Sequence, residues 1–202
     1  MSKRAEHYYT ASPNSLLKVS EAILKLPSGR TYRFKTPSGV FSFGRVDRAS
    51  RLLINHAILP ESGALLDIGS GYGCVGITLC REHPGLSLHM SDINERAVRF
   101  TEINARDHNL QAEIRLGNLY EPWADRSFDV ILSNPPIAAG KLVVESLISG
   151  ARDRLTDGGY FELVAYHNKG GARLESFMKR VFGNALTVVK SGGIRVYVSQ
   201  KL

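Results

Sequence analysis

Short apolar runs alternate with longer amphipathic runs from residue 64 almost to the end, and this alternation constrains the fold of the 202-residue chain most. Runs typical of strands occur at 64–68, 86–91, 112–116, 128–133, 158–166, 185–190 and 193–199. Runs with helical spacing fit between them at 73–82, 94–107, 141–154 and 171–182. This pattern predicts an α/β fold with a doubly wound, mostly parallel sheet of seven strands. Only residues 191–193 separate the last two strands, so we expect these strands to form an antiparallel C-terminal hairpin.

The first quarter of the chain differs from the rest in pattern and in charge. Residues 21–26 and 30–35 alternate apolar and polar side chains around a Pro-Ser-Gly turn, which predicts a small N-terminal β-hairpin. Residues 1–51 hold ten Lys and Arg against three acidic residues, so the whole net charge of +7 lies there. This distribution is typical of a surface that binds phosphates, although a solvated, solubilising arm explains it equally well.

Asp47 lies at the boundary that we expect between two parts of the chain. Its side chain is placed to cap a helix over 48–58, whose apolar residues keep helical spacing. We therefore predict a basic extension at 1–46, a candidate phosphate-gripping arm, and a main domain at 47–202.

Several classes of protein are excluded by what the chain lacks. No apolar run reaches the length of a membrane span, and residues 1–9 are polar and charged where a secretory signal would be apolar. We therefore expect a cytoplasmic protein. Cys74 and Cys80 are six residues apart within one predicted helix, so we interpret both as buried apolar side chains and expect neither a disulfide nor a metal site.

A glycine turn follows the first strand of the predicted sheet. Gly69, Gly71 and Gly73 alternate with other residues there, which lets the backbone turn tightly and approach a ligand beside the free amides of the next helix. The segment also matches the dinucleotide fingerprint, but in the wrong frame, because that turn begins with the first glycine after the strand. Asp67 would moreover repel a pyrophosphate. An acid beside a glycine turn suits a ligand with an ammonium group.

Polar residues also end the second and third strands. Asp92 is placed to accept hydrogen bonds from both hydroxyls of a ribose, although it also suits a helix cap. Asn118 follows the third strand and can lay its amide against the edge of an adenine, although Asn is equally common in turns.

The fourth strand ends in Asn134-Pro135-Pro136-Ile137, the most specific motif of the chain. Two prolines fix the backbone and remove two donors, which leaves the carbonyls of Asn134 and Pro135 free to accept. With the Asn side-chain oxygen beside them, two convergent acceptors suit a planar amine that carries two hydrogens. Binding both hydrogens orients the amine and leaves its lone pair available for attack.

These successive motifs resemble those of the class I S-adenosylmethionine-dependent methyltransferases, specifically the "methyltransferase small" group, which includes guanine-N2 methyltransferases of small-subunit ribosomal RNA. The resemblance covers nearly the whole chain, because residues 39–42 and 45–47 also look like that group's lead-in. It implies a Rossmann-like class I methyltransferase fold with S-adenosylmethionine as the cofactor. The group usually has Asp at the position of Asn118 and often an aromatic residue at the position of Ile137.

The resemblance also implies a role for each motif residue. Asn134 and Pro135 would hold the target amine and are the predicted catalytic residues. The predicted cofactor-binding residues are Asp67, Gly69, Gly71, Tyr72, Gly73, Asp92, Ile93, Asn118, Leu119 and Asn134. The predicted substrate-binding residues are Pro136, Ile137, Phe41 and Arg45. Because Ile137 is not aromatic, we expect either a ring from Phe41, Phe43 or Tyr72 to stack on the acceptor base, or edge contacts to hold it.

The predicted function is methyl transfer to an exocyclic amine of a nucleobase in RNA, with guanine N2 of rRNA or tRNA favoured. The basic extension would then bind the RNA backbone beside the pocket. A protein glutamine amide and adenine N6 of DNA are alternatives with the same chemistry. From other classes, a non-catalytic cofactor-binding adapter and an NAD-dependent dehydrogenase are less well supported. We interpret His89 as a core residue and His167 as a loop residue at the substrate mouth.

Overall fold

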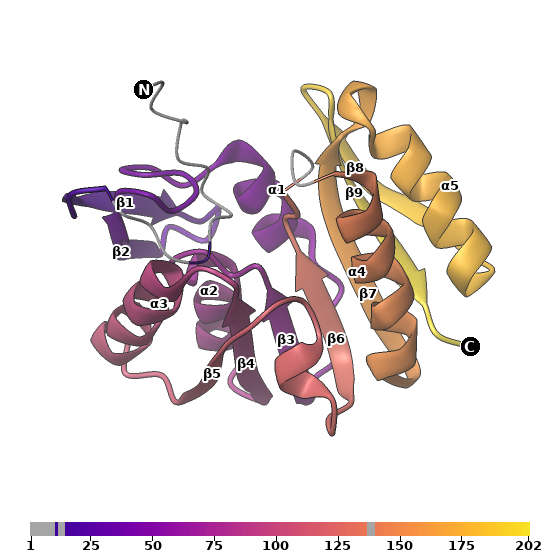
Figure 1. The fold of residues 1–202 in the computed structure, drawn as a ribbon, viewed down its shortest axis with the longest axis horizontal. Coiled ribbons are helices and arrows are strands. Elements are labelled where there is room, and N and C mark those ends of the chain that lie inside the picture. The colour runs from indigo at the N-terminus through magenta and orange to yellow at the C-terminus, as the bar shows by residue number, and fades with distance from the viewer. Residues whose placement is uncertain (1–10, 12–14, 137–139) are drawn as a thin grey trace, which may run out of the picture.

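The computed structural model describes residue 11 and residues 15–136 and 140–202. It contains a two-stranded sheet and a seven-stranded sheet with helices around it (Figure 1). The strands are β1 (Val19–Lys25), β2 (Thr31–Pro37), β3 (Gly63–Ile68), β4 (Leu86–Asp92), β5 (Ala112–Leu116), β6 (Phe128–Ser133), β7 (Leu155–Tyr166), β8 (Leu186–Ser191) and β9 (Ile194–Gln200). The helices are α1 (Arg48–His56), α2 (Cys74–Glu82), α3 (Glu95–Asp107), α4 (Lys141–Arg154) and α5 (Gly171–Phe182), with short 3₁₀ turns η1 (Glu121–Trp123) and η3 (His167–Lys169).

The large sheet has the strand order β5-β4-β3-β6-β7-β9-β8. Strands β3 to β7 pair in parallel, while β9 runs antiparallel between β7 and β8. The predicted doubly wound sheet with an antiparallel C-terminal hairpin is therefore confirmed. The order reverses direction at β3, where the chain crosses from the β4 side to the β6 side. Ligands of open α/β sheets bind at such a point, beyond the carboxyl ends of the strands.

Most element boundaries agree with the expectation within two residues, and α4 and α5 agree at both ends. Helix α1 is shorter than the predicted 48–58 because Ala57 already has extended backbone angles. The amide of Ile58 instead donates to Oε1 of Glu162 on β7 over 2.7 Å. A strand side chain thus provides the hydrogen bond that another helical turn would have provided.

The sheet separates two apolar cores, as expected when helices cover both faces. Because successive strand residues point to opposite faces, Leu65 packs with the α1, α2 and α3 side while Leu66 packs with the α4 and α5 side. The largest fully buried side chain is Trp123 of η1, whose indole Nε1 donates to Ser91 Oγ over 3.0 Å. No helix within the described ranges is long and apolar enough to cross a membrane.

The predicted N-terminal hairpin is formed by β1 and β2, and it packs onto α3 (Figure 1). Its inward side chains, including Leu24 and Phe34, belong to the same apolar core as α2 and α3. The buried amide of Asn104 on α3 joins the two parts. It accepts from the Lys35 amide over 2.8 Å, and it donates to the carbonyls of Lys35 and Tyr72 over 2.9 and 2.8 Å.

Candidate active site

A cavity lies at the carboxyl ends of β3, β4, β5 and β6, at the point where the strand order reverses. It brings together the glycine turn, Asp92, Asn118 and the Asn-Pro-Pro motif, which are far apart in the sequence. Its lining residues are Val40, Phe41, Ile68, Gly69, Gly71, Ser91, Asp92, Ile93, Gly117, Asn118, Leu119, Ser133, Asn134, Pro135, Pro136, Val143, Val144 and Leu147. The strand ends thus form one site, where the sequence motifs predicted it.

The glycine turn forms the floor of this cavity. Gly69 and Gly71 have φ angles of +70° and +62°, which side chains of L-residues rarely permit. A Cβ atom on Gly69 would meet nothing within 4 Å, so the glycine leaves open space at the cavity wall. The turn is held from behind, because Thr101 Oγ1 donates to the Gly71 carbonyl over 2.9 Å. This rigid, open turn can hold a ligand close to the main chain.

Two carboxyls flank the glycine turn, and they are held differently. Asp92 accepts from the amides of Gly71 and Asn94, each over 2.9 Å, and lines the cavity. Burial raises the pKa of the Asp92 carboxyl to about 6. Asp67 is buried beneath the turn and accepts from the Gly76 amide over 3.0 Å. Burial raises its pKa to about 7, so near neutral pH Asp92 is mostly ionised while Asp67 is only partly ionised.

The adenine end expected at Asn118 is open and apolar. Asn118 is exposed, and its Nδ2 donates to Glu121 Oε1 over 3.4 Å. Ile93 and Leu119 also line the cavity, and Leu119 has a positive φ of 47°. Two aliphatic side chains and an amide in one lining suit a flat heterocycle.

The Asn-Pro-Pro motif forms what we call the acceptor corner, defined as Asn134, Pro135 and Pro136, directly after β6. Its side-chain amide is held by the beginning of α1. Nδ2 of Asn134 donates to Ser50 Oγ over 2.9 Å and to Asp47 Oδ2 over 3.3 Å. Asp47 also caps α1 by accepting from the amides of Ala49 and Ser50. Because both donors of the side-chain amide face α1, its oxygen lies on the opposite side.

The oxygen atoms of the acceptor corner have no donor among the residues that the structure describes. This holds for Oδ1 of Asn134 and for the main-chain carbonyls of Asn134 and Pro135, whereas most buried carbonyls have partners. The prolines cannot donate, so they do not compete for these acceptors. The corner therefore offers several acceptors, and its two prolines contribute no main-chain donor.

Some residues expected at the site lie elsewhere. Tyr72 is buried in the core, where its ring is 6.0 Å from that of Phe34 and its hydroxyl donates to the Arg45 carbonyl. Gly73 precedes α2 and, like Asp67, does not line the cavity. The Arg45 side chain is exposed outside the lining. Of the three proposed rings, only that of Phe41 lines the cavity, and Ile137 lies outside the described residues.

The two cysteines and two histidines that the sequence analysis singled out do not line this cavity. Cys74 and Cys80 are free and buried, as expected. His167 Nδ1 lies 2.8 Å from the Tyr197 hydroxyl. His89 is buried edge-on against Trp123, and burial lowers the pKa of its imidazole. No group of three or more potential metal ligands occurs in the part of the chain described.

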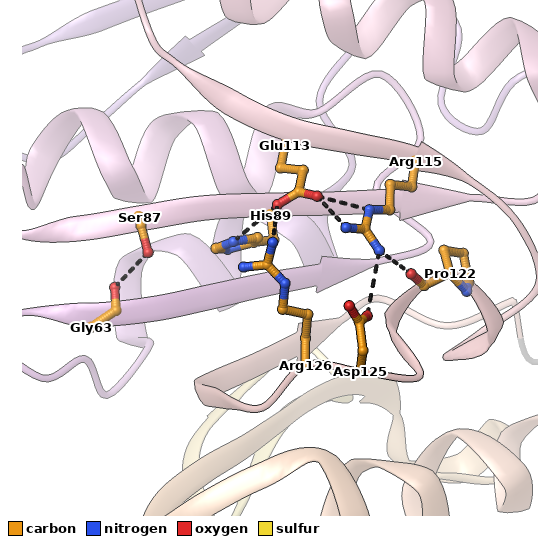
Figure 2. A network of polar contacts seen from close by, with 8 residues as sticks. All are labelled: Gly63, Ser87, His89, Glu113, Arg115, Pro122, Asp125 and Arg126. Atoms are coloured by element: carbon orange, nitrogen blue, oxygen red, sulfur yellow. Dashed lines mark hydrogen bonds and ion pairs between the residues drawn. The ribbon is translucent and has the colours of Figure 1, made fainter.

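His89 belongs to a second polar group, drawn in Figure 2, which we call the Glu113 cluster. Its members are His89, Glu113, Arg115, Asp125 and Arg126. Glu113 accepts from Arg115, and its second oxygen is 3.4 Å from Arg126 and 3.6 Å from His89. Arg115 also lies over the Trp123 ring at 4.3 Å. The cluster lies across β4 and β5 and contributes nothing to the cavity lining.

The sequence analysis missed two sets of functional residues. Val143, Val144 and Leu147 of α4 close one side of the cavity, and the only signal for them was a helix that begins soon after the Asn-Pro-Pro motif. Asp47 was identified as a helix cap, but its contact and that of Ser50 with Asn134 were not foreseen. The contacts span 87 and 84 residues, and no local pattern reports such a distance.

In a comparison with protein families, the family model described as "Methyltransferase small domain" matches residues 31–198 of this chain. Among curated proteins, "Uncharacterized protein YbxB" of Bacillus subtilis (strain 168) is 31% identical, and the match covers 98% of this chain and 100% of that protein. "Ribosomal RNA small subunit methyltransferase C" of Photorhabdus laumondii is 32% identical over 82% of this chain and 49% of its own length.

Among solved structures, "T. Thermophilus 16S rRNA N2 G1207 methyltransferase (RsmC) in complex with AdoMet and Guanosine" superimposes with a TM-score of 0.78 and 26% identity. The match covers 93% of this chain and 51% of that one. The chain thus spans about half the length of the ribosomal RNA small subunit methyltransferase C proteins that it matches.

Proposed function

Because the chain belongs to the methyltransferase small domain family, we propose that it methylates an exocyclic amine of a nucleobase in RNA, namely N2 of a guanine in ribosomal RNA. It is an S-adenosylmethionine-dependent methyltransferase. The acceptor corner carries the proposal, because its oxygens lack donors among the described residues and its three residues line a cavity built by four strand ends. An amine with two hydrogens is the group that such a corner can hold.

The residues of the cavity fit S-adenosylmethionine, which supplies an electrophilic methyl group on a sulfonium when bound. The open space at Gly69 leaves room for a ligand against the main chain. Asp92 is fixed by two amides with its carboxylate at the lining, where it can accept from ribose hydroxyls. Ile93, Asn118 and Leu119 would hold the adenine. Asp67 does not line the cavity and would act indirectly, by accepting from the Gly76 amide at the beginning of α2.

The acceptor corner would orient the target amine. Ser50 and Asp47 hold Nδ2 of Asn134, so that Oδ1 is available to accept one amine hydrogen. A main-chain carbonyl of Asn134 or Pro135 would accept the second hydrogen. With both hydrogens bound, the lone pair of the amine nitrogen is directed away from the corner. Positioning of this kind can produce large rate gains, because two reacting groups held in alignment reach effective molarities of about 10⁵ M or more.

No strong base is needed in this scheme. After the transfer, the methylated nitrogen is positively charged, and its extra proton passes to an acceptor of the corner and then to water. The target base cannot be reached while it is stacked in a helix, so it would be single-stranded or flipped out. Phe41 lines the cavity and is the described ring best placed to stack on it.

Guanine in ribosomal RNA is favoured by two of the three relatives named above, which are ribosomal RNA methyltransferases, and one of these two, the solved structure, carries guanosine. The glutamine amide of a protein is the second candidate, because it is also planar with two hydrogens. To separate them, purified protein would be incubated with labelled S-adenosylmethionine and total RNA and protein from a strain that lacks the gene. We expect N2-methylguanosine in ribosomal RNA by mass spectrometry, and a labelled protein band would contradict the proposal.

The Asn134→Ala protein tests the corner itself. We expect methylation to fall below detection while calorimetry still shows cofactor binding, because only the target amine loses its acceptor. The exposed Asn55→Ala, on α1 and outside the lining of the cavity, serves as the matched control and should retain full activity. Full activity of the Asn134→Ala protein would remove the proposed role of the corner.

A further inference from the structure

A second cavity adjoins the first, between the beginnings of α4 and α5. Val144 lines both cavities, so the two adjoin at α4. The second cavity has a volume of about 570 Å³, within the range of roughly 300–1,000 Å³ that is usual for ligand sites. We call it the α4–α5 groove, and its polar lining includes Lys141, Glu145, His167, Lys169 and Arg173.

The groove contains cations without acidic partners. Lys169 and Arg173 are exposed, and no ion pair joins either to a carboxylate of residues 15–136 or 140–202. Lys141 is 3.6 Å from Glu145, its neighbour one turn further along α4. The groove therefore carries a net positive charge next to the first cavity.

The basic N-terminal hairpin differs in this respect. Arg30 pairs with Glu82, Arg33 with Glu21, and Lys35 with Asp107, over 3.0, 2.6 and 2.8 Å. Three of its cations are thus neutralised by neighbouring acids. The role of residues 1–46 in gripping RNA stays a prediction, but the cations of the groove are better placed to meet an anion at the site.

Aromatic rings accompany the cations of the groove. Nζ of Lys169 is 5.5 Å from the centre of the half-exposed Tyr166 ring, and Phe177 lines the groove. Cations that alternate with rings are typical of surfaces that bind single-stranded nucleic acid, in which phosphates meet the charges and bases stack on the rings. An acidic protein segment would use the charges but would gain little from the rings.

Basic residues continue along the same edge toward the acceptor corner. The amide of His167 donates to the Gly193 carbonyl over 2.9 Å, which ties the groove to the β8–β9 turn. The guanidinium of Arg48 lies against that turn, because a Cβ atom on Gly192 would come within 2.5 Å of it. Arg48 in turn precedes Ser50, which holds Asn134. Arg48 and His167 of the groove thus both contact the β8–β9 turn.

We propose that the α4–α5 groove binds the phosphates of the single-stranded RNA segment next to the target base, with Lys169 and Arg173 as the main contacts. This inference rests on the proposed function, which it extends from the base to the strand that carries it. The groove would hold the strand while its target base enters the first cavity. It would therefore increase the affinity for RNA and leave the affinity for S-adenosylmethionine unchanged.

The test compares two double variants that each remove two positive charges. Lys169→Ala/Arg173→Ala changes the groove, and Arg106→Ala/Lys179→Ala removes exposed cations at the ends of α3 and α5. Binding of a fluorescent single-stranded RNA is measured by anisotropy at several salt concentrations, and methylation kinetics are measured in parallel. For the groove variant we expect about tenfold weaker RNA binding, a salt dependence lower by about 1.4 in the log–log slope, and an unchanged Kd for S-adenosylmethionine.

The outcomes separate this inference from the proposed function. Equal RNA affinities of the groove variant and the control variant would overturn the groove proposal, even if both methylate RNA. Weaker RNA binding by the groove variant alone would support it, even if the methylated product turned out to be a protein amide. Preferential loss of binding to an acidic peptide, with RNA binding unchanged, would instead assign the groove to a protein partner and overturn the proposal.

Discussion

The acceptor corner and the Glu113 cluster are both polar and both lie at strands of one sheet or directly beside them, but their polar groups face different partners. In the Glu113 cluster, each charged group has an opposite charge within 4 Å (Figure 2). In the acceptor corner, the amide donors are held by α1 while the oxygens lack donors in the part of the chain that the structure describes. Charges paired with one another stabilise a fold, whereas acceptors held open at a cavity are available to a ligand. The pairing in the cluster is one of charges, because the buried Nδ1 of His89 has no hydrogen-bond partner among the described residues.

The carboxyl groups of the Glu113 cluster and of the cavity around the acceptor corner show the same contrast. The hydrogen bond from Arg115 is the main reason that the pKa of Glu113 is lowered. Burial raises the pKa of Asp92, at the cavity, to about 6. The same chemical group is thus stabilised as an anion in one region and disfavoured as an anion in the other. We therefore expect variants of the cavity to affect activity and variants of the Glu113 cluster to affect stability.

The largest effect is expected from reversing the hydrogen bond between Asn134 and Asp47. Asn134→Asp places a second carboxylate about 3 Å from Asp47 Oδ2, and kcat should fall by about 10²–10³-fold. The double variant Asn134→Asp/Asp47→Asn restores one donor between the two positions and should recover at least about tenfold of that loss. Steady-state methylation assays of both proteins test this, and equal kcat values for the single and double variants would contradict it.

A smaller loss is expected from the other partner of Asn134. Ser50→Ala removes one of two acceptors from the side-chain amide, so the amide samples other orientations and kcat falls by about tenfold. The KM for S-adenosylmethionine should not change, because Ser50 does not line the cavity. Ser176→Ala, an exposed helical serine on α5, is the matched control. A fall in thermal stability with unchanged kcat would show that Ser50 acts only in the fold.

The pH dependence of cofactor affinity should reflect Asp92. Its pKa of about 6 means that the carboxyl gains a proton as the pH falls through 6, and it then loses acceptor capacity toward the ribose. We expect the Kd for S-adenosylmethionine to rise several-fold between pH 7.5 and pH 5.5, measured by calorimetry. Asp92→Asn should bind more weakly at pH 7.5 and show no such dependence. Persistence of the slope in that variant would assign it to another group, such as Asp67.

The smallest effect on activity is expected in the Glu113 cluster. Glu113→Gln should leave kcat within about twofold and lower the free energy of unfolding by about 1 kcal/mol or less, because the carboxylate is 36% exposed and screened. The pKa of Glu113 is lower in the folded protein, so its contribution exists above about 4.5 and disappears as the pH falls through the folded-state pKa. Denaturant unfolding at pH 7 and pH 3.5 measures this, and a difference that grows at pH 3.5 would contradict it.

Much of the fold could be predicted because its signals are local. The strand and helix runs gave the order of the elements, and the short connection at 191–193 specified the antiparallel hairpin. The position of the site followed as well, since the motifs lie at strand ends that a parallel sheet brings together.

The remaining features depend on contacts that no local pattern encodes. Tyr72 alternates with glycines in the turn, but the direction of its side chain depends on Gly71 and Gly73, whose φ angles are +62° and +88°. Its ring therefore packs on Phe34 of the hairpin instead of facing the cavity. The charge surplus of the first quarter was also visible, but not that three of its cations pair with acids. Net charge reports composition, whereas the fold determines which charges remain available.

The buried amide of Asn104 has a consequence for engineering. Because it bonds the main chain of Lys35 and the carbonyl of Tyr72 together, a chimaera with a foreign hairpin would have to reproduce the backbone of β2 at this level. A graft that failed to do so would leave a polar group stranded in the core, at a cost of about 1–3 kcal/mol. The misfit would be transmitted to the glycine turn, because the carbonyl of Tyr72 belongs to that turn. Exchange of specificity between relatives should therefore retain residues 31–37 together with α3 as one transplanted unit.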